Sequence, residues 1–238
     1  MSIQKDKNGF FVWGDYQQGS PGLGVQSDRI DECIDYYHAN GFNGLFGSAS
    51  FGFDQDNLDF LVQAPAVQWL WFWDINLKNI DPLYGLNQLN HFGIHPKRPG
   101  IDFSRLPSLR TAVNFWIKSD TGITKSKITE YYHWHYKPRD KSYEGLEMPK
   151  NVKKLEMNWA NPASLEGLPV MKKLKSLQFH RCRNLNDLSA LPRVAPNLEN
   201  LLITTSSKVD PTDGILDHPT LKSAWIDGNE YARQDPAE

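Results

Sequence analysis

Residues 150–205, KNVKKLEMNWANPASLEGLPVMKKLKSLQFHRCRNLNDLSALPRVAPNLENLLITT, contain the same short phrase three times. The phrase has apolar residues at three matching positions, and the first of these is held by Val152, Leu174 and Leu198. These anchors lie 22 and 24 residues apart. A recurring period of this size is typical of proteins that are built from stacked repeats.

Weaker forms of the phrase occur on both sides of this stretch. They lie at residues 42–47, 67–72, 89–94, 107–113, 128–136 and 219–226. Short segments between them supply one or two apolar residues each, at 57–61, 81–86, 162–168 and 185–191. One unit of about 22 residues cannot bury its apolar row alone, so we expect the units to stack, to share a core and to align their strands as a parallel sheet.

The period and the phrase together resemble the leucine-rich repeat family over most of the chain, from about residue 42 to residue 226. The family pattern LxxLxLxx(N/C)xL is kept in part, because Cys182 and Asn229 occupy its Asn/Cys position. Two other repeats hold Ala160 and Ser206 there instead. The asparagine ladder of the family is therefore incomplete in this chain.

The phrases around Leu83 and Leu165 are similar to the returns of bacterial, internalin-like repeats. The resemblance implies an α/β fold, namely a leucine-rich repeat solenoid with a parallel β-sheet on its concave face. It also implies irregular or short helical returns on the convex side and an N-terminal capping helix. We expect an N-terminal cap with a strand and a helix at 1–41, a solenoid of about eight to nine units at 42–229 and a polar tail at 230–238.

The clearest helix lies at residues 27–40, where Ser27 is placed to act as its N-cap. An apolar stripe at the spacing i, i+3, i+4 and i+7 runs along it. The stripe consists of Ile30, Cys33, Ile34 and Tyr37. Asn40 and Gly41 end the helix, because both residue types tolerate a positive φ.

Composition excludes several classes of protein. The chain has 238 residues and a net charge of −2, so it carries no electrostatic footprint for nucleic acid. The two cysteines lie far apart in the chain, which argues against a disulfide framework and a four-ligand zinc site. The N-terminus has no secretory pattern, and the longest apolar tract, 67–73, is too short to span a bilayer. We therefore expect a soluble, cytoplasmic protein that binds neither nucleic acid nor membrane.

Aromatic residues are numerous, with 8 Trp, 9 Tyr and 12 Phe, and many lie between residues 42 and 136. Because side chains alternate along a strand, we expect Trp69, Trp71 and Trp73 to face the concave side, with His91 and His95 in the next unit. Exposed apolar patches mark interaction sites. The alternative is that the N-terminal cap or the loop at residues 51–53 covers this row of tryptophans.

Two middle units allow two registers, and a slip of one residue moves every side chain to the other face. Strict spacing from Leu109 would bury Ala112 and Asn114, and an unpaired buried Asn or His costs about 1–3 kcal/mol. We therefore expect the slipped register in both units. In it, the buried residues are Val113, Phe115, Ile117, Tyr132 and Trp134, and the exposed ones are Asn114, Trp116, Tyr131, His133 and His135.

The later units place polar residues on the concave side. Together with the aromatic and histidine residues, they give one set of candidate partner-binding residues. The set comprises Trp69, Trp71, Trp73, His91, His95, Trp116, Tyr131, His133, His135, Glu156, Asn158, Gln178 and His180. Two loops rich in proline and basic residues, at 96–100 and 137–142, are either solvated or in contact with a partner.

Catalytic chemistry has little support in the sequence. The motifs G-x-S-x-G and H-E-x-x-H do not occur, and no pair of carboxylates is placed at a common cleft. The pairs His133/His135 and His91/His95 have no carboxylate or cysteine at a matching spacing. We therefore expect no enzyme activity, no cofactor and no metal.

These observations predict a module that binds another protein. The resemblance to leucine-rich repeat proteins, some of which block enzymes tightly, favours a bacterial immunity protein that neutralises a cognate toxin domain. A carbohydrate-binding module that uses the tryptophan row is an alternative, as is an effector or adhesin. The sequence leaves the identity of the partner and the oligomeric state open.

Overall fold

The computed structural model describes residues 3–16, 20–95, 97–206, 208–209, 215 and 217–231, and only the backbone at residues 15, 16 and 20. The chain divides into two compact units. The first unit comprises Met1–Ala112 and Ile117–Gly122, and the second comprises Val113–Trp116 and Ile123–Glu238.

The strands of the first unit are hydrogen-bonded in chain order. They are β1 (Ile3–Lys5), β2 (Phe11–Tyr16), β3 (Ser20–Gly24), β4 (Gly44–Gly47), β5 (Trp69–Phe72) and β6 (His91–Ile94), and β7 (Thr111–Phe115) begins in this unit. The pairs β1–β2 and β2–β3 are antiparallel, whereas β3 to β6 are parallel. The helices are α1 (Ile30–Asn40) and the 3₁₀ turns η1 (Ser27–Arg29), η2 (Ala49–Phe51), η3 (Asp59–Gln63), η4 (Asp81–Gly85) and η5 (Phe103–Arg105).

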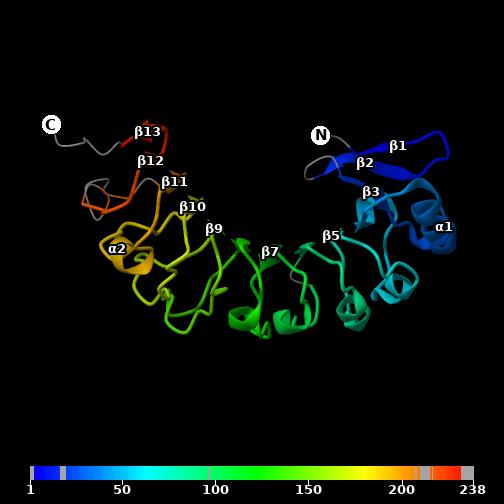
Figure 1. Ribbon diagram of the computed structural model, residues 1–238, viewed down its shortest axis with the longest axis horizontal. Helices are drawn as coiled ribbons and strands as arrows, with labels where there is room; N and C mark the ends of the chain where they lie inside the picture. Colours follow the sequence, from blue (N-terminus) through cyan, green and yellow to red (C-terminus); the bar gives the residue numbers. More distant parts are fainter. Residues whose placement is uncertain are drawn as a thin grey trace. The chain divides into compact units, whose positions relative to one another are not determined.

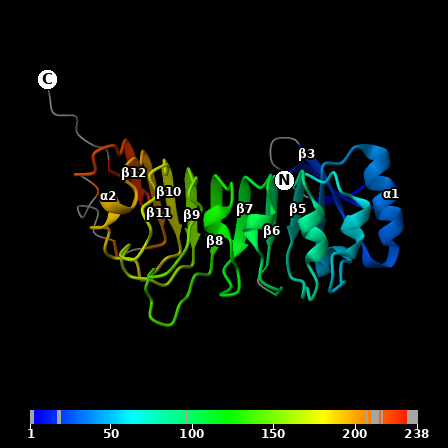
Figure 2. The same cartoon turned by 60° about the horizontal axis from the view of Figure 1, so that its bottom comes forward.

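The second unit repeats the parallel arrangement. Its strands are the end of β7, then β8 (Glu130–Trp134), β9 (Lys154–Asn158), β10 (Ser176–His180), β11 (Asn200–Thr204), β12 (Ser223–Ile226) and β13 (Asn229–Glu230). Its helices are η6 (Ile123–Lys125) and α2 (Leu191–Val194). The strands β8 to β12 are parallel, as Figure 2 shows for β9 to β12, and β13 pairs with β12 in the antiparallel sense.

The predicted strands are confirmed at every position where the phrase recurs, and their apolar positions are in register. In the first unit Leu23, Leu45, Leu70 and Phe92 form one buried row across β3 to β6. In the second unit the corresponding row across β9 to β12 is Leu155, Leu177, Leu201 and Ala224. Each row removes apolar surface from water that a single unit would expose, and this burial is the main favourable term in folding.

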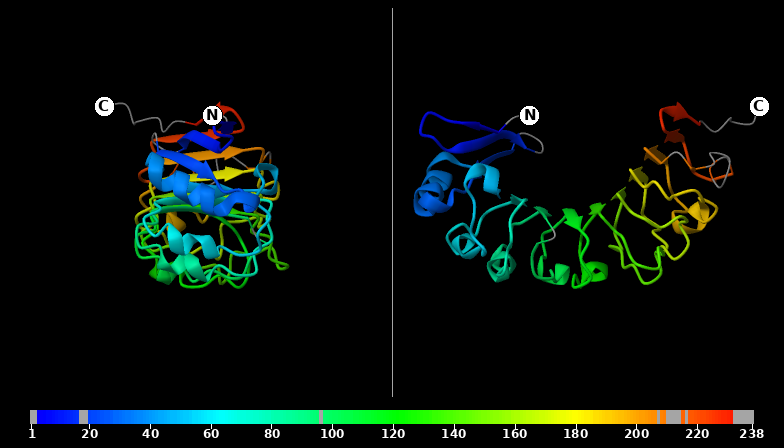
Figure 3. Two further views of the ribbon diagram at one scale, coloured as in Figure 1. Left: turned by 90° about the vertical axis from the view of Figure 1, so that its right-hand side faces the viewer. Right: turned by 180° about the vertical axis from the view of Figure 1, so that it is seen from behind.

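The segments between strands return on the other side of the core, as predicted. Leu83 and Leu86 of the η4 segment are buried, and so are Leu165 and Leu168 in the second unit. Figure 3 shows that, within each unit, the strands follow one side and the short helices of the returns follow the other. We call the side of the strands that faces away from the returns the open face.

The helix near the N-terminus begins three residues later than predicted. Residues 27–29 form η1, and the Ser27 hydroxyl accepts a hydrogen bond from the Asp54 N–H at 2.9 Å instead of capping α1. Cys33, Ile34 and Tyr37 are buried as predicted, and Gly41 ends α1 with a φ of 67°. In Figure 1, α1 lies beside β3, which it contacts.

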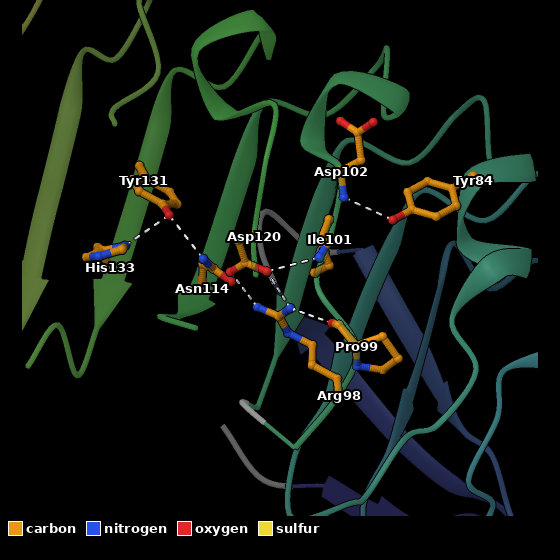
Figure 4. A network of polar contacts seen from close by, with 9 residues as sticks. All are labelled: Tyr84, Arg98, Pro99, Ile101, Asp102, Asn114, Asp120, Tyr131 and His133. Carbon is orange, nitrogen blue, oxygen red and sulfur yellow. Dashed lines mark hydrogen bonds and ion pairs between the residues drawn. The ribbon is translucent and has the colours of Figure 1, made fainter. Parts of the chain in front are cut away.

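The slipped register predicted for β7 and β8 is wrong. Asn114, Tyr131 and His133 point into the core of the second unit and are 2, 3 and 1 % exposed. The Tyr131 hydroxyl receives a hydrogen bond from Asn114 Nδ2 at 3.1 Å and lies 2.9 Å from His133 Nδ1, as Figure 4 shows. The predicted cost of burying Asn and His does not arise, because both side chains bond to a third polar group in the same core.

The loop at residues 97–100 is tied down rather than solvated. Both terminal nitrogens of Arg98 donate to Asp120, at 2.6 and 2.9 Å, and Asp120 also accepts from the Ile101 N–H (Figure 4). The side chain of Arg98 is completely buried. Because a paired and hydrogen-bonded charge is the form in which a buried guanidinium is tolerated, Arg98 fixes this loop within the first unit. Pro96 lies outside the described residues.

Candidate functional site

The tryptophan row of the first unit lies on the open face, as predicted, but it fills space within the unit. Gly22, Gly44 and Trp69 are aligned on neighbouring strands, and a β-carbon at either glycine would overlap the indole ring of Trp69. The ring therefore lies flat across two glycine positions. Trp69 is 3 % exposed, so it presents almost no surface to a partner.

Two more aromatic residues of this open face also lie over a glycine of the neighbouring strand. Phe46 covers Gly24, and Trp71 covers Gly93, the residue aligned with it on β6. Glycine weakens a strand because it has no side chain to pack, and an aromatic ring on the adjacent strand makes good that loss. Both aromatic residues thus have a structural role in the unit.

Trp13 of β2, in the N-terminal region, covers part of the tryptophan row. Its ring meets Phe46, Trp69 and Trp73 edge-on, with centroids 5.7, 6.2 and 6.4 Å apart. Phe51, in the loop predicted as the other cover, packs against Trp73 at 5.6 Å. Trp71 and Trp73 remain half-buried, so these two rings are what the row can offer to a partner.

His91 and His95 belong to the same face of the first unit. His91 is 2 % exposed and stacks on Trp71 with ring centroids 6.3 Å apart. Burial lowers the pKa of His91 to about 4, so it is neutral at physiological pH. Burial also lowers the pKa of His95, an effect that Asp74 opposes and Lys97 reinforces. His91 therefore contributes to the packing of the first unit as a buried, neutral side chain.

The open face of the second unit is polar, as predicted. Glu156, Asn158, Gln178 and His180 all lie on it and are partly or largely buried. Asn158 Nδ2 donates to Glu156 Oε1 at 2.7 Å. His180 Nδ1 lies 2.6 Å from Thr204 Oγ1, and its Nε2 lies 3.3 Å from Gln178 Oε1. These contacts restrict the side chains before any ligand arrives, which lowers the entropy cost of binding.

Lys154 and Tyr132 continue this face towards β8. Lys154 Nζ donates to the Tyr132 hydroxyl at 3.1 Å and lies 5.1 Å from the centre of its ring. Burial lowers the pKa of Lys154, but the Tyr132 hydroxyl and the nearby carboxylates of Glu130 and Glu156 outweigh that effect and raise it. Lys154 is therefore held as a cation on this face.

Rings gather where the strands of the second unit end. Phe115 stacks on His135 at 5.6 Å, and His135 stacks on Trp159 at 4.9 Å with an interplanar angle of 1°. The Arg181 guanidinium lies 4.8 Å from the Trp159 ring. Trp134 contacts both Phe115 and Trp159, at 5.0 and 5.1 Å. We call these five residues the aromatic platform.

The backbone explains why the platform forms. His135, Trp159 and Arg181 each follow the last residue of their strand and have φ values of 59, 52 and 57°. The left-handed conformation costs roughly 1–2 kcal/mol for a residue with a β-carbon. In return the three side chains occupy equivalent positions on neighbouring strands, where they stack, and aromatic pairs of this kind contribute about 0.5–1.5 kcal/mol each.

The structure thus brings only part of the predicted set to an accessible surface. Tyr131 and His133 lie in the core, and Trp69 and His91 are covered. Trp116 is half-buried and meets Tyr136 edge-on at 5.1 Å. Sequence reasoning missed Trp159 and Arg181, although the spacing from His135, 24 and then 22 residues, marks the same position in three successive repeats.

The described part of the chain has neither a metal-binding cluster nor a membrane-spanning helix. Among those residues, no group of three or more His, Cys, Asp or Glu side chains could hold a metal ion. The longest helix described, α1, has 11 residues, and no described helix is long and apolar enough to cross a bilayer. Cys33 and Cys182 are buried free thiols, and burial raises the pKa of Cys182 to about 11.

In comparisons of the sequence, no protein-family model and no curated protein matches this chain. The candidate site therefore rests on geometry alone: an aromatic platform beside a polar open face, both in the second unit.

Proposed function

We propose that this chain is a leucine-rich repeat protein that binds another protein through the open face and the aromatic platform of its second unit. In this proposal it is a bacterial, cytoplasmic immunity protein that neutralises a cognate toxin domain. It has no catalytic activity, and β1 to β3 together with α1 cap the N-terminal end of the repeats.

The repeat assignment is supported by spacing and by one side chain. Aligned core residues of the second unit, such as Leu155, Leu177 and Leu201, recur at intervals of 22 and 24 residues. At the Asn/Cys position of its repeat, Cys182 donates from Sγ to the carbonyl oxygen of Met157 at 3.4 Å. A donor that satisfies a buried carbonyl at the turn after a strand is what such a position requires.

The protein-binding role is supported chiefly by the aromatic platform. Trp134, His135 and Trp159 are all partly exposed, and Arg181 is exposed. Trp and Arg dominate the energetics of protein interfaces, and rigid side chains lose little entropy on binding. The platform adjoins Asn158 and His180, the last residues of β9 and β10, whose side chains are already hydrogen-bonded. An aromatic anchor beside a restricted polar surface is the composition of a specific interface.

The proposal is tested with the gene that lies next to this one. The domain that the adjacent reading frame encodes is expressed in a host with and without this chain, and growth is measured. We expect growth to be restored by this chain, and the purified pair to associate in a calorimetric titration. If the domain is not toxic, or if the pair does not associate, the immunity role is wrong.

Two variants of the same chain locate the interface. Trp159→Ala removes the central ring of the platform and is expected to weaken the complex by about 30-fold or more, the size of an interface hot spot. Val170→Ala is the control, because Val170 is an exposed apolar residue, 49 % accessible, in the return between β9 and β10. Equal affinities of the two variants would contradict the proposed surface.

A carbohydrate ligand is a second candidate, favoured by Trp225. This ring is 43 % exposed on the open face and is aligned with Leu202 on β11, while Ser223 beside it donates to Asn200 at 2.9 Å. An exposed ring next to fixed polar groups suits the face of a sugar ring. Binding on a glycan array that is lost in Trp225→Ala would favour this candidate over the protein partner.

A further inference from the structure

Positive charge is concentrated in residues 123–209 of the second unit, whereas residues 210–238 hold two basic against seven acidic residues. Residues 123–209 contain 15 lysines and arginines against eight aspartates and glutamates. Residues 1–122 show the opposite balance, with nine basic against 13 acidic residues. The net charge of −2 for the whole chain therefore conceals a basic region in the part that carries the aromatic platform.

Three of these cations lie on neighbouring turns at the edge that carries the platform. Lys137 follows His135 by two residues, Arg181 closes the platform, and Arg183 follows on the same turn. The turns lie side by side, because the Asn161 N–H donates to the Tyr136 carbonyl and Asn184 Nδ2 donates to the Asn161 carbonyl. All three cations are exposed, and none forms an ion pair with another described residue.

One carboxylate lies close in sequence to these cations. Asp140 follows Lys137 by three residues, accepts a hydrogen bond from the Ser142 N–H at 3.2 Å and forms no ion pair with another described residue. Three cations against this one carboxylate leave a net positive charge on the turns, which attracts a negatively charged partner.

The order of stacking indicates which ligand chemistry fits. Trp159 lies between His135 and Arg181, which come from the two strands that flank β9. Side chains from both neighbouring strands thus contact the indole of Trp159. The platform ends in a guanidinium group held by a cation–π contact, whose N–H donors match the geometry of a carboxylate.

We propose that Arg181, Lys137 and Arg183 form the docking edge for an acidic segment of the protein partner, in which an Asp or Glu carboxylate pairs with Arg181. This inference rests on the proposed function, because it specifies the chemistry of the partner that the second unit binds. A carboxylate-rich segment gains from the charge of all three cations, and the association weakens as salt screens that attraction.

The probe for this edge is a fluorescein-labelled peptide of ten glutamates, and its binding is followed by fluorescence anisotropy. We expect wild-type protein to bind the peptide at about 25 mM salt and to lose at least tenfold in affinity at about 300 mM. A single-stranded DNA of similar length is the comparison polyanion. Tighter binding of the DNA than of the peptide, or no binding of the peptide at low salt, would overturn the inference.

Arg181→Gly is the informative variant, because its φ of 57° suits glycine and the substitution relieves strain while removing the guanidinium. We expect its affinity for the peptide to fall at least tenfold. Thr205→Gly makes the same backbone change at a φ of 56° without loss of charge, and Lys172→Ala removes one exposed charge elsewhere in the unit. Both controls should stay within about twofold of wild type.

The outcomes separate this inference from the proposed function. If the adjacent toxin domain binds Arg181→Gly as tightly as it binds wild type, the protein-binding role stands and the acidic docking edge is wrong. If the peptide binds through Arg181 while no toxin domain is neutralised, the edge stands and the immunity role is wrong. If Arg181→Gly and Lys172→Ala bind the peptide with equal affinity, the loss of affinity depends only on the net charge of the protein, and the assignment of the docking edge is wrong.

Discussion

Tyr131 carries the hydroxyl group that allows two polar side chains to lie in the core of the second unit. Asn114 donates a hydrogen bond to this hydroxyl from β7, and His133 contacts it from β8, the strand that also contains Tyr131. A buried polar group is costly only when it lacks a partner, and a satisfied network specifies one arrangement of the core. The register of β7 and β8 is therefore a property of three residues considered together.

Replacing Tyr131 with Phe tests this network. The variant keeps the ring but removes the hydroxyl that Asn114 and His133 contact, so we expect the free energy of unfolding to fall by about 1–3 kcal/mol. Tyr132→Phe is the matched control on the next residue, because its hydroxyl lies on the partly exposed face and bonds only to Lys154 among the hydrogen bonds described. Its effect should stay within about 0.5 kcal/mol in urea titrations. Equal losses in the two variants would refute the role of the network.

His91 makes the stability of the first unit depend on pH. Its pKa is about 4 in the folded chain because of burial, whereas an unfolded histidine titrates near about 6.5. Below the unfolded pKa, the unfolded chain binds a proton that folded His91 does not bind, so stability falls as the pH drops from about 6.5 towards 4. Above that window, the group contributes no pH dependence.

We expect this effect to appear as a difference between wild type and His91→Gln. Between pH 7.5 and pH 5, wild type should lose about 2 kcal/mol more of its free energy of unfolding than the variant does. Urea titrations at the two pH values measure both losses, and the other histidines are common to both proteins. Parallel pH profiles would show that His91 is not the group responsible.

At the scale of elements, glycine and aromatic residues on neighbouring strands are complementary in the first unit. Gly22 and Gly44 leave room for Trp69, and Gly93 leaves room for Trp71. The strand alternation in the sequence predicts that these tryptophans form an exposed row, but in the structure their rings pack over glycines of the adjacent strands. Tryptophan thus fills glycine positions in β5 and forms part of an accessible platform in the second unit.

Gly44→Ala is predicted to disturb this pairing. The added methyl group would overlap the ring of Trp69, and overpacking of this kind costs about 1–3 kcal/mol. Gly85→Ala is the control, since an added β-carbon there meets no atom within 4 Å. In the background of Trp69→Ala, the cost of Gly44→Ala should largely disappear. An undiminished cost in that background would mean that the clash is not with Trp69.

At the scale of the molecule, the chain consists of two compact units, each with its own buried rows. In a stack of repeats, each strand contacts mainly its neighbours, so a defect weakens nearby strands first. Leu70 and Leu177 hold the same core position in different units and are both fully buried. They offer a matched pair of probes.

Leu70→Ala and Leu177→Ala each remove a buried side chain at a cost of about 2–5 kcal/mol. We expect Leu70→Ala to lower hydrogen-exchange protection most in β4 to β6, and Leu177→Ala to lower it most in β9 to β11. Each variant serves as the control for the other when peptide-resolved exchange is measured by mass spectrometry. A uniform loss of protection along the chain in both variants would show a single cooperative unit instead.

The sequence by itself determined where the strands lie, which residues form the core rows of β4 to β6 and β9 to β12, and that the returns close the core, because apolar side chains at a fixed period have no other way to be buried. It also placed Glu156, Asn158, Gln178 and His180 on one face, since strand alternation is local. Tertiary structure alone decided three things: that Trp69 is covered, that Tyr131 and His133 are buried, and that Trp159 meets Arg181. Each depends on which side chain lies on the neighbouring strand, at a distance of about 22 residues in sequence, and no local pattern contains that information.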